Sequence, residues 1–388
     1  MTTSTLRVGI DVRLAHWPGI GRYIEEIVAR MVADYPTTEF VLFDNAHGAA
    51  TLRDYADPGL RQRLQASNVT FVPCAAKPFS LFEPWALARI VRQSGVHVMH
   101  SPYINIPWLD GHTIPLVVTL HDFRHPDLAM QWRSPRTWFK RVYYEVLTRL
   151  ALHRACMTVC VSEFLAGQLR VFRPALAQRI HVITHAADAS FHPVPRAQAG
   201  ATVAQRLHVP QPYFLFVGTF KPHKNLLAVV RALARLPATV HLAVAAAPDP
   251  RYPEVERAVR QLQLQQRVHF LGHLPKEALP TLYSAATATL LPSDYESFGL
   301  PVVESMACAT PVIAAPQAAL QEVGGEAACY ATPNPEALAC AMHDVLHHPH
   351  PAQLQTASLE RAAGFSWARS AAQLHQLYRR AAGRAPNH

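Results

Sequence analysis

The chain is expected to adopt an α/β fold made of two domains, each with a parallel β-sheet covered by helices on both faces. Short apolar runs with strand character alternate with helical patterns along most of the sequence, which is typical of parallel sheets. A proline- and glycine-punctuated stretch over residues 191–212 interrupts this alternation and is interpreted as an interdomain linker. At 388 residues, the chain is also longer than one ordinary hydrophobic core supports.

The first series of elements predicts seven strands joined by helices. The strand-like runs are residues 6–10, 39–43, 69–72, 96–99, 115–120, 156–161 and 180–184. Behind the first run, a glycine loop that includes Gly19 and Gly21 leads into a helical pattern with one apolar face. The loop lacks the GxGxxG spacing of dinucleotide-binding enzymes, which disfavours a dehydrogenase. It suits either a close approach of the backbone to a ligand or a plain turn.

The strand-like run at 115–120 ends in the pair His121 and Asp122. Open α/β sheets bind ligands at the carboxyl ends of their strands, so this pair is placed at a functional edge. A second interpretation is the metal-binding dyad of a phosphohydrolase. That site needs further ligands, and His125 is the neighbour that could supply one.

The segment from Arg124 to Arg154 is both basic and aromatic. It carries seven Lys and Arg residues against Asp127 and Glu145, and its aromatic residues are Trp132, Trp138, Phe139, Tyr143 and Tyr144. This composition fits an element at an anionic membrane surface, and it fits equally a core helix with a solvated basic face. Nucleic acid is a third partner for such charge, but no recognition motif accompanies it.

The second series of elements begins at residue 213. Strands are predicted at residues 213–218, 240–245, 268–271, 287–291, 310–314 and 327–330, with a helix at 224–236. The loop after the first of these strands, GTFKPHKN, carries Lys221 and Lys224 beside the next helix start. Lysines at this place complement a diphosphate, although lysines before a helix are also commonly solvated.

Residues 292–304, PSDYESFGLPVVE, join a strand to a helix and carry the strongest functional signal. The backbone N–H groups of Phe298, Gly299 and Leu300 are expected at the helix N-terminus, where they and the helix dipole favour an anion. Glu296 and Glu304 flank them, and carboxylates accept hydrogen bonds from sugar hydroxyls. The combination suits a nucleotide sugar, whereas a glutamate pair by itself is also consistent with ordinary surface.

Composition limits the class of protein further. The net charge of +9 and the pI of about 9.4 suit an anionic partner. No apolar run reaches the ~18 residues of a membrane span, and the N-terminus lacks a basic-then-apolar signal pattern. The cysteines show no CxxC, and four of them, Cys156, Cys160, Cys308 and Cys340, are expected to be buried reduced thiols. These features indicate a cytoplasmic protein.

With these motifs in view, the sequence resembles the retaining glycosyltransferases of family four, which have the GT-B fold. The segments that carry the resemblance are GIDVRLAHWPGIGRYIEEI, LVVTLHDFRHP, CVSEFL, HVITHAAD, FVGTFKPHKNL, PSDYESFGLPVVESMACATPVIAA and FSWARSAAQLHQLY. The resemblance implies two Rossmann-like domains facing across a cleft. An acceptor-binding domain would cover residues 1–198 and a donor-binding domain residues 199–366, with residues 367–388 crossing back as a helix to the first domain.

The resemblance also implies roles for single residues. Glu304 would hold the donor ribose, Glu296 the hydroxyls of the donor sugar, and Lys224 the diphosphate. The N–H groups of Phe298, Gly299 and Leu300 would meet sugar and diphosphate. His121 would lie near the anomeric centre as a catalytic residue together with Glu296, and the loop of Gly19 and Gly21 would close on donor or acceptor.

The implied activity is hexosyl transfer from a nucleotide-diphosphate sugar, with GDP-mannose favoured, to a glycan or lipid-linked glycan in cell-surface polysaccharide or lipopolysaccharide synthesis. No acidic metal-binding motif appears, so neither a metal nor a cofactor is expected, and nucleic acid is not expected as a partner. A peripheral position at the inner membrane face through residues 124–154 is expected. The alternative is a GT-B protein that binds a nucleotide sugar as an epimerase, a hydrolase or a non-catalytic partner.

Three positions depart from the family pattern. His223 stands where the family often has an arginine shortly before its phosphate-binding lysine. Ala309 replaces the usual glycine before Thr-Pro. The family's Asn-Gly-Val-Asp is His185-Ala186-Ala187-Asp188 here.

Overall fold

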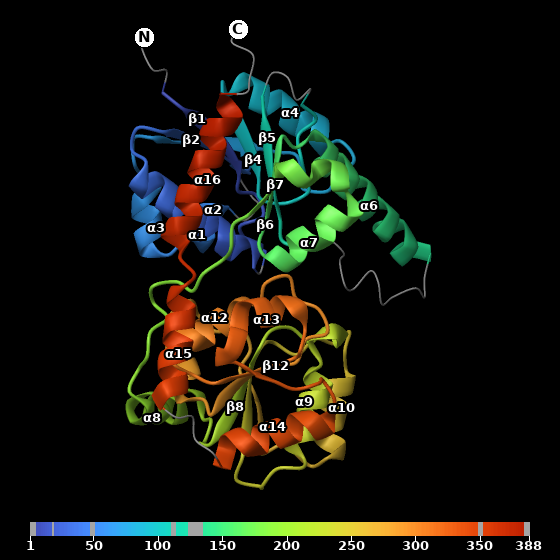
Figure 1. Cartoon of the computed structure of the whole chain (residues 1–388), viewed down its shortest axis with the longest axis vertical. Coiled ribbons are helices and arrows are strands. Elements are labelled where there is room, and N and C mark those ends of the chain that lie inside the picture. Colours follow the sequence, from blue (N-terminus) through green and yellow to red (C-terminus); the bar gives the residue numbers. More distant parts are fainter. Residues whose placement is uncertain are drawn as a thin grey trace. The chain divides into compact units, whose positions relative to one another are not determined.

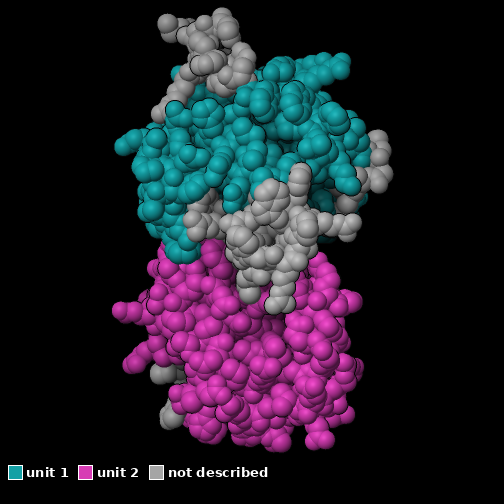
Figure 2. Space-filling view, turned by 90° about the vertical axis from the view of Figure 1, so that its right-hand side faces the viewer, with its two compact units in different colours: residues 1–185, 367–388 teal, residues 186–366 magenta. Residues whose placement is uncertain are grey.

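The computed structural model describes residues 5–17, 19–46, 51–109, 114–122, 135–347 and 352–383; within these ranges, the side chains of residues 55, 135–141 and 352 are not described. The chain forms two compact units (Figure 2). The first unit comprises residues 1–185 and 367–388, and the second comprises residues 186–366.

The first unit contains a seven-stranded parallel sheet in the order β3-β2-β1-β4-β5-β6-β7. Its strands are β1 (Arg7–Asp11), β2 (Glu39–Asn45), β3 (Val69–Cys74), β4 (Val98–Ser101), β5 (Leu116–Leu120), β6 (Met157–Cys160) and β7 (Ile180–Val182). Its helices are α1 (Ile20–Asp34), α2 (Leu52–Tyr55), α3 (Pro58–Arg63), α4 (Glu83–Gln93), α6 (Pro135–Arg154), α7 (Glu163–Phe172) and α16 (Trp367–Ala382), with a 3-10 turn at η1 (Pro174–Arg179).

The second unit contains a six-stranded parallel sheet in the order β10-β9-β8-β11-β12-β13. Its strands are β8 (Tyr213–Val217), β9 (His241–Ala245), β10 (Val268–Phe270), β11 (Ala288–Leu291), β12 (Val312–Ala314) and β13 (Cys329–Tyr330). Its helices are α8 (Arg196–Leu207), α9 (Leu226–Leu233), α10 (Glu254–Gln261), α11 (Leu279–Ala285), α12 (Leu300–Ala307), α13 (Ala318–Gly324), α14 (Pro335–His347) and α15 (Ala352–Ala363), with short turns at η2 (Pro222–Lys224), η3 (Lys276–Ala278) and η4 (Gly325–Ala327).

The predicted α/β class with two all-parallel sheets is confirmed, and each predicted strand corresponds to an observed one. The central strands read as continuous apolar runs because helices bury both of their faces. In the second unit, one core cluster lies around Phe216 and Val230, and the other lies around Tyr213 and Tyr283. Strands β8 and β9 therefore contribute side chains to both hydrophobic clusters.

The interpretation of residues 191–212 as a linker is wrong, because this stretch contains α8. The helix buries Ala199, Gly200 and Val203. Such small side chains leave only a weak hydrophobic pattern in the sequence. Phe191, further upstream, packs edge-on against Tyr283 with 5.9 Å between ring centroids. The second unit accordingly begins at Ala186, earlier than the sequence boundary after residue 198.

Helix α16 belongs to the first unit although it follows the second unit in the chain. It lies beside α1 (Figure 1). Its Tyr378 hydroxyl lies 2.7 Å from His100 Nδ1, and His375 Nε2 lies 3.0 Å from Thr38 Oγ1. These contacts bind the C-terminal helix to the first sheet.

All six cysteines are free thiols. Cys160 and Cys308 are buried as predicted, whereas Cys156 is half-buried. The prediction that Cys340 is buried is wrong, since this residue is exposed on α14. The helix directs Leu338 and Met342 into the core instead. Among the described residues, no helix is long and apolar enough to span a membrane.

Candidate functional site

The loop between β11 and α12 holds most of the predicted binding residues of the second unit. Helix α12 begins at Leu300, so the N–H groups of Phe298, Gly299 and Leu300 lie at its N-terminus as expected. Gly299 has φ 93° and ψ 54°, and a Cβ there would stand 2.5 Å from Leu320 Cδ2. Glycine is therefore required by both backbone conformation and space. Among the described residues, no side chain caps the N-terminus of α12.

Glu296 pairs with Lys224 across two loops of the second unit. Lys224 Nζ lies 2.5 Å from Glu296 Oε1, and the two side chains are 19% and 14% exposed. Ser293 donates a hydrogen bond to the same oxygen at 2.9 Å. The adjacency arises because Lys224 follows β8 and Glu296 follows β11, and these two strands are neighbours in the sheet. From the sequence, the two residues were expected to bind different parts of a ligand, and their pairing with each other was not predicted.

Glu304 lies on the second turn of α12 and is nearly buried, with 5% of its surface exposed. The Tyr283 hydroxyl donates a hydrogen bond to Glu304 Oε2 at 2.9 Å. Tyr283 itself is fully buried in α11. A buried carboxylate held by a fixed donor is a rigid hydrogen-bond acceptor, which suits recognition of a hydroxyl group.

Three residues that hold these loops in place were not predicted from the sequence. Asn225 adopts a left-handed conformation with φ 55° at the start of α9, and its side-chain amide donates to the Pro292 carbonyl at 2.9 Å. Ser293 supports Glu296, and Gln317 Nε2 donates to the Glu296 carbonyl at 3.2 Å. An asparagine between a lysine and a helix start is the one signal in the sequence that could have indicated this arrangement, because asparagine tolerates that conformation.

One departure from the family pattern, Ala309, has a structural consequence, and Asp188, which keeps the family's residue, makes contacts of its own. Ala309 has φ 55°, a region that favours glycine, so the alanine is strained there. Asp188 accepts a backbone hydrogen bond from Ser190 at 2.7 Å and pairs with Lys276 at 2.8 Å. Asp188 therefore has a structural role within the second unit.

In the first unit, both predicted glycines are required for local structure. Gly19 has φ 81° and precedes α1. A Cβ at Gly21 would stand 2.0 Å from the Ala15 carbonyl oxygen. The glycines therefore let the loop after β1 turn tightly into α1, and this accounts for them without a ligand.

His121 lies just beyond β5 in a cluster of aromatic rings. Its ring centroid is 4.9 Å from that of Tyr23 and 5.3 Å from that of His185. Burial lowers the pKa of His121 to about 4, although a hydrogen bond to the Pro102 carbonyl opposes the shift. Nε2 is buried and has no hydrogen-bond partner among the described residues, so the N–H that Pro102 accepts belongs to Nδ1. At neutral pH the ring is uncharged and offers a lone pair at Nε2.

Asp122, the neighbour of His121, accepts hydrogen bonds from two tyrosines. The Tyr103 hydroxyl donates to Asp122 Oδ1 at 3.3 Å, and the Tyr144 hydroxyl donates to the same oxygen. Within the described ranges, no group of three or more His, Cys, Asp or Glu residues is arranged to hold a metal ion. His125, which the dyad interpretation needs, lies outside the described residues.

The basic and aromatic segment 124–154 is only partly described. Tyr143 donates a hydrogen bond to the Phe79 carbonyl at 2.9 Å, Tyr144 bonds Asp122, and the Arg154 guanidinium lies 4.0 Å from the Trp108 ring centroid. These three residues are used inside the first unit. Arg133 and the side chains of Arg136, Lys140 and Arg141 lie outside the described residues.

Comparison with known proteins shows the family to which the sequence is similar. The sequence profile of "Glycosyltransferase Family 4" matches residues 17–191, and that of "Glycosyl transferases group 1" matches residues 203–363. The O-antigen chain mannosyltransferase B of Escherichia coli is 30% identical over 93% of this chain and 96% of its own length. The D-inositol 3-phosphate glycosyltransferase of Mycolicibacterium smegmatis is 31% identical over 76% of this chain and 71% of its own.

The fold is also similar to that of solved structures. The sucrose-phosphate synthase of Thermosynechococcus elongatus superposes with a TM-score of 0.75 at 23% identity, over 97% of this chain and 98% of its own. Anabaena HepE in complex with UDP-glucose superposes with a TM-score of 0.73 at 18% identity, over 96% and 99%. At these identities the likeness concerns the GT-B fold.

Proposed function

Because the chain belongs to glycosyltransferase family 4, we propose that it transfers a mannosyl group from GDP-mannose to a hydroxyl of a glycan in cell-surface polysaccharide synthesis. The structural observation that carries the proposal is the convergence of Lys224 and Glu296 beside the N-terminus of α12. A cation and a helix N-terminus suit a diphosphate, and a carboxylate suits sugar hydroxyls. The choice of mannose rests on the Escherichia coli relative.

In the proposed reaction, the bond between the anomeric carbon and the diphosphate oxygen breaks, and the diphosphate leaves with the electron pair. The acceptor hydroxyl attacks from the same face and gives its proton to the departing phosphate, so the configuration is retained. Lys224 and the N–H groups of Phe298, Gly299 and Leu300 stabilise the negative charge that develops on the diphosphate. Because the chain's own groups stabilise this charge, the reaction is proposed to be metal-independent.

Glu304 is proposed to hold the ribose hydroxyls, since its carboxylate is fixed by Tyr283. Glu296 is proposed to hold the donor sugar, and His121 to act near the anomeric centre as an uncharged hydrogen-bonding group. His121→Ala should therefore bind GDP like the wild type and yet transfer poorly. Near-normal turnover of this variant would remove His121 from the catalytic residues.

The donor is tested first by thermal shift with GDP-mannose, UDP-sugars and dTDP-sugars. A ligand at one hundred times its Kd should add ~2.7 kcal/mol to the free energy of unfolding. Incubation with the stabilising donor alone then separates transfer from the alternatives: free sugar indicates a hydrolase, and a changed sugar indicates an epimerase. With an acceptor glycan present, NMR of the new linkage gives the anomeric configuration, and inversion would contradict the mechanism.

We also propose that the protein acts at the cytoplasmic membrane face on a lipid-linked or polysaccharide-linked acceptor. The support is an exposed apolar and basic face at α4, which we call the α4 face. Leu81, Phe82 and Trp85 are 71%, 80% and 57% exposed, and Arg89 and Arg92 follow on the same side of the helix. Aromatic residues beside arginines suit an anionic lipid surface, where each basic residue contributes ~1 kcal/mol.

A further inference from the structure

Four aromatic side chains of the first unit form a cluster at the carboxyl ends of the strands. Trp17 follows β1, Phe79 precedes α4, Tyr103 follows β4, and Tyr144 lies on α6. Trp17 and Phe79 stack with 5.4 Å between centroids and 28° between planes. Tyr103 lies 6.3 Å from Trp17 and 6.0 Å from Phe79, and Tyr144 lies 6.5 Å from Tyr103. We call these four residues the aromatic cluster.

The two sides of the aromatic cluster differ in exposure. Tyr103 is buried, whereas Trp17 is 38% exposed and Phe79 is half-buried. Tyr103 therefore packs against the accessible rings of Trp17 and Phe79 from the buried side. An exposed tryptophan stacked on a second ring is a preformed surface for a flat apolar ligand face.

Asp122 adds a polar group beside the rings. Burial raises the pKa of Tyr103, and the Asp122 charge raises it further, so its hydroxyl stays protonated and donates to Oδ1. The Tyr144 hydroxyl donates to the same oxygen. Among the described residues, both bonds fall on Oδ1, and Oδ2 is the oxygen that can accept from a ligand hydroxyl.

Phe79 occupies a strained backbone conformation, with φ 63°. Two side chains hold it: Glu83 accepts from its N–H, and the Tyr143 hydroxyl donates to its carbonyl at 2.9 Å. A strained residue that its surroundings hold in place on both sides is typical of a binding site. Tyr143 is thus positioned to orient the Phe79 ring.

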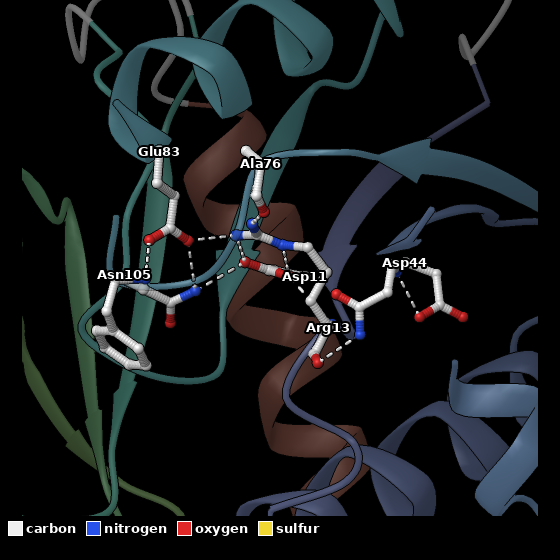
Figure 3. A network of polar contacts seen from close by, with 8 residues as sticks. Asp11, Arg13, Asp44, Ala76, Glu83 and Asn105 are labelled. Atoms are coloured by element: carbon white, nitrogen blue, oxygen red, sulfur yellow. Dashed lines mark hydrogen bonds and ion pairs between the residues drawn. The ribbon is translucent and has the colours of Figure 1, made fainter. Parts of the chain in front are cut away.

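Glu83 is itself fixed by a buried ion network (Figure 3). Nη2 of the fully buried Arg13 donates to Glu83 Oε1 and to Asp11 Oδ2, each at 2.6 Å. Its Nη1 donates to the Ala76 carbonyl at 2.8 Å, and its Nε donates to Asp11 Oδ1 at 2.9 Å. Asn105 Nδ2 donates to Asp11 and Glu83 at 3.1 and 3.2 Å. Buried ion pairs add little net stability, so their value here lies in orienting the loop that carries Phe79.

We propose that Trp17, Phe79 and Asp122 form a subsite for one neutral hexopyranose ring of the glycan acceptor, with Tyr143 and Glu83 as positioning residues. The C–H face of a pyranose ring packs on an aromatic surface, and Asp122 accepts a hydrogen bond from a ring hydroxyl. The carboxylate disfavours an anionic ligand, which distinguishes this subsite from a phosphate site. The inference rests on the proposed function, because that function supplies a glycan acceptor.

The test uses simple sugars on the full-length protein, with no donor present. Methyl α-mannopyranoside, methyl α-glucopyranoside and methyl β-galactopyranoside are titrated at millimolar concentration, with saturation-transfer NMR as the readout. Wild type should bind at least one of them and transfer saturation to its C–H face. Trp17→Ala and Phe79→Ala should weaken that binding about tenfold, because each removes one ring of the stack. Tyr143→Phe, which keeps every ring, should weaken it about threefold.

Phe172→Ala is the matched control, since Phe172 is an aromatic residue of the first unit that is 38% exposed, like Trp17, but lies at the end of α7, outside the aromatic cluster. Its sugar binding should equal that of the wild type. Unchanged binding by Trp17→Ala, or no binding of the whole sugar panel by the wild type, overturns the subsite. GDP binding by the wild type is measured in parallel. If the wild type binds GDP but the sugar tests fail, only the subsite is wrong and the proposed function stands. If the wild type does not bind GDP, the proposed function itself is wrong.

Discussion

Lys224 Nζ lies 2.5 Å from Glu296 Oε1, so the residues proposed for the diphosphate and for the donor sugar form one ion pair. A diphosphate that approaches Lys224 competes with this carboxylate for the same ammonium group. Ser293 and Gln317 hold Glu296 in the loop, and Asn225 joins the loop to the start of α9. Glu296 is therefore held by further hydrogen bonds, and we expect Lys224 to exchange this carboxylate for a phosphate.

Glu296→Gln should tighten binding of GDP while it reduces transfer. The substitution removes the anion that competes for Lys224, and an ion pair of this exposure is worth about 1 kcal/mol, or roughly a fivefold change in Kd. Calorimetric titration with GDP measures the first effect and turnover measures the second. Glu336→Gln breaks the exposed pair with Arg235 and is the control, for which GDP binding should not change. Weaker GDP binding by Glu296→Gln would contradict the competition.

Glu304→Ala should weaken binding of GDP-mannose and of GDP alike, because both contain the ribose. Loss of one charge-assisted hydrogen-bond partner costs ~1.5–3 kcal/mol. Tyr283→Phe keeps the carboxylate but removes the hydroxyl that fixes it, so a smaller loss is expected there. Titrations are compared with thermal melts to confirm that each variant is folded. If GDP binds the Glu304 variant as it binds the wild type, the ribose assignment is wrong.

Replacing apolar residues of the α4 face by polar ones should abolish membrane binding. We expect the wild type to float with vesicles that contain anionic lipid, to bind less at high salt because charges are screened, and to bind neutral vesicles weakly. Phe82→Ser combined with Trp85→Ser should prevent flotation. The same two changes at Val171 and Phe172, exposed apolar residues at the end of α7, are the control and should have no effect. Equal binding to neutral and anionic vesicles would remove the lipid proposal.

Ala309→Gly should stabilise the second unit. Alanine at φ 55° carries about 1–2 kcal/mol of strain, and part of the relief is offset by the greater freedom of glycine in the unfolded chain. A net gain of about 0.5–1 kcal/mol is expected in urea unfolding. Ala201→Gly, at an exposed position inside α8, should instead lose about 1 kcal/mol. A loss at both positions would show that Ala309 is not strained.

The buried histidines of the first unit should make its stability fall in mild acid. Burial lowers the pKa of His100 to about 3 and that of His121 to about 4, from 6.5. Between pH 6.5 and these values, the unfolded chain binds more protons than the folded one, so the free energy of unfolding decreases as pH drops. Fully buried His100 contributes about 1.4 kcal/mol per pH unit in this window, and the partly accessible His121 contributes less.

The quantity to measure is the difference between wild type and His100→Asn in urea unfolding from pH 7 to pH 5. A difference is needed because burial raises the pKa of Asp44 to about 6, and this acts in the opposite direction. The free energy of unfolding should change less steeply with pH in His100→Asn than in the wild type. Replacing the exposed His192 by glutamine should leave the pH dependence of the free energy of unfolding as in the wild type. The same pH dependence in all three proteins would contradict the conclusion that His100 is buried and neutral.

The amino-acid sequence by itself determined the order of the elements and the local chemistry of the loops. The strands at residues 213–218 and 287–291 are recognisable in the sequence because strands buried on both faces are continuously apolar. The start of α12 at Leu300 follows from Gly299 and Pro301, whose backbone preferences act locally. Helix α8 was missed because its buried face of Ala199, Gly200 and Val203 carries little hydrophobic contrast.

Only the tertiary structure decided which distant residues meet. Lys224 and Glu296 pair because β8 and β11 are adjacent in the sheet, an order that connectivity does not reveal. Likewise, Arg13 pairs with Glu83, which lies 70 positions away in the sequence. Tyr143 donates a hydrogen bond to Phe79, although the sequence suggested that its segment contacts a membrane. Backbone propensity acts between near neighbours, whereas these contacts depend on strand order and on packing across the sheet. The residues with the most specific proposed roles therefore have partners that lie far away in the sequence.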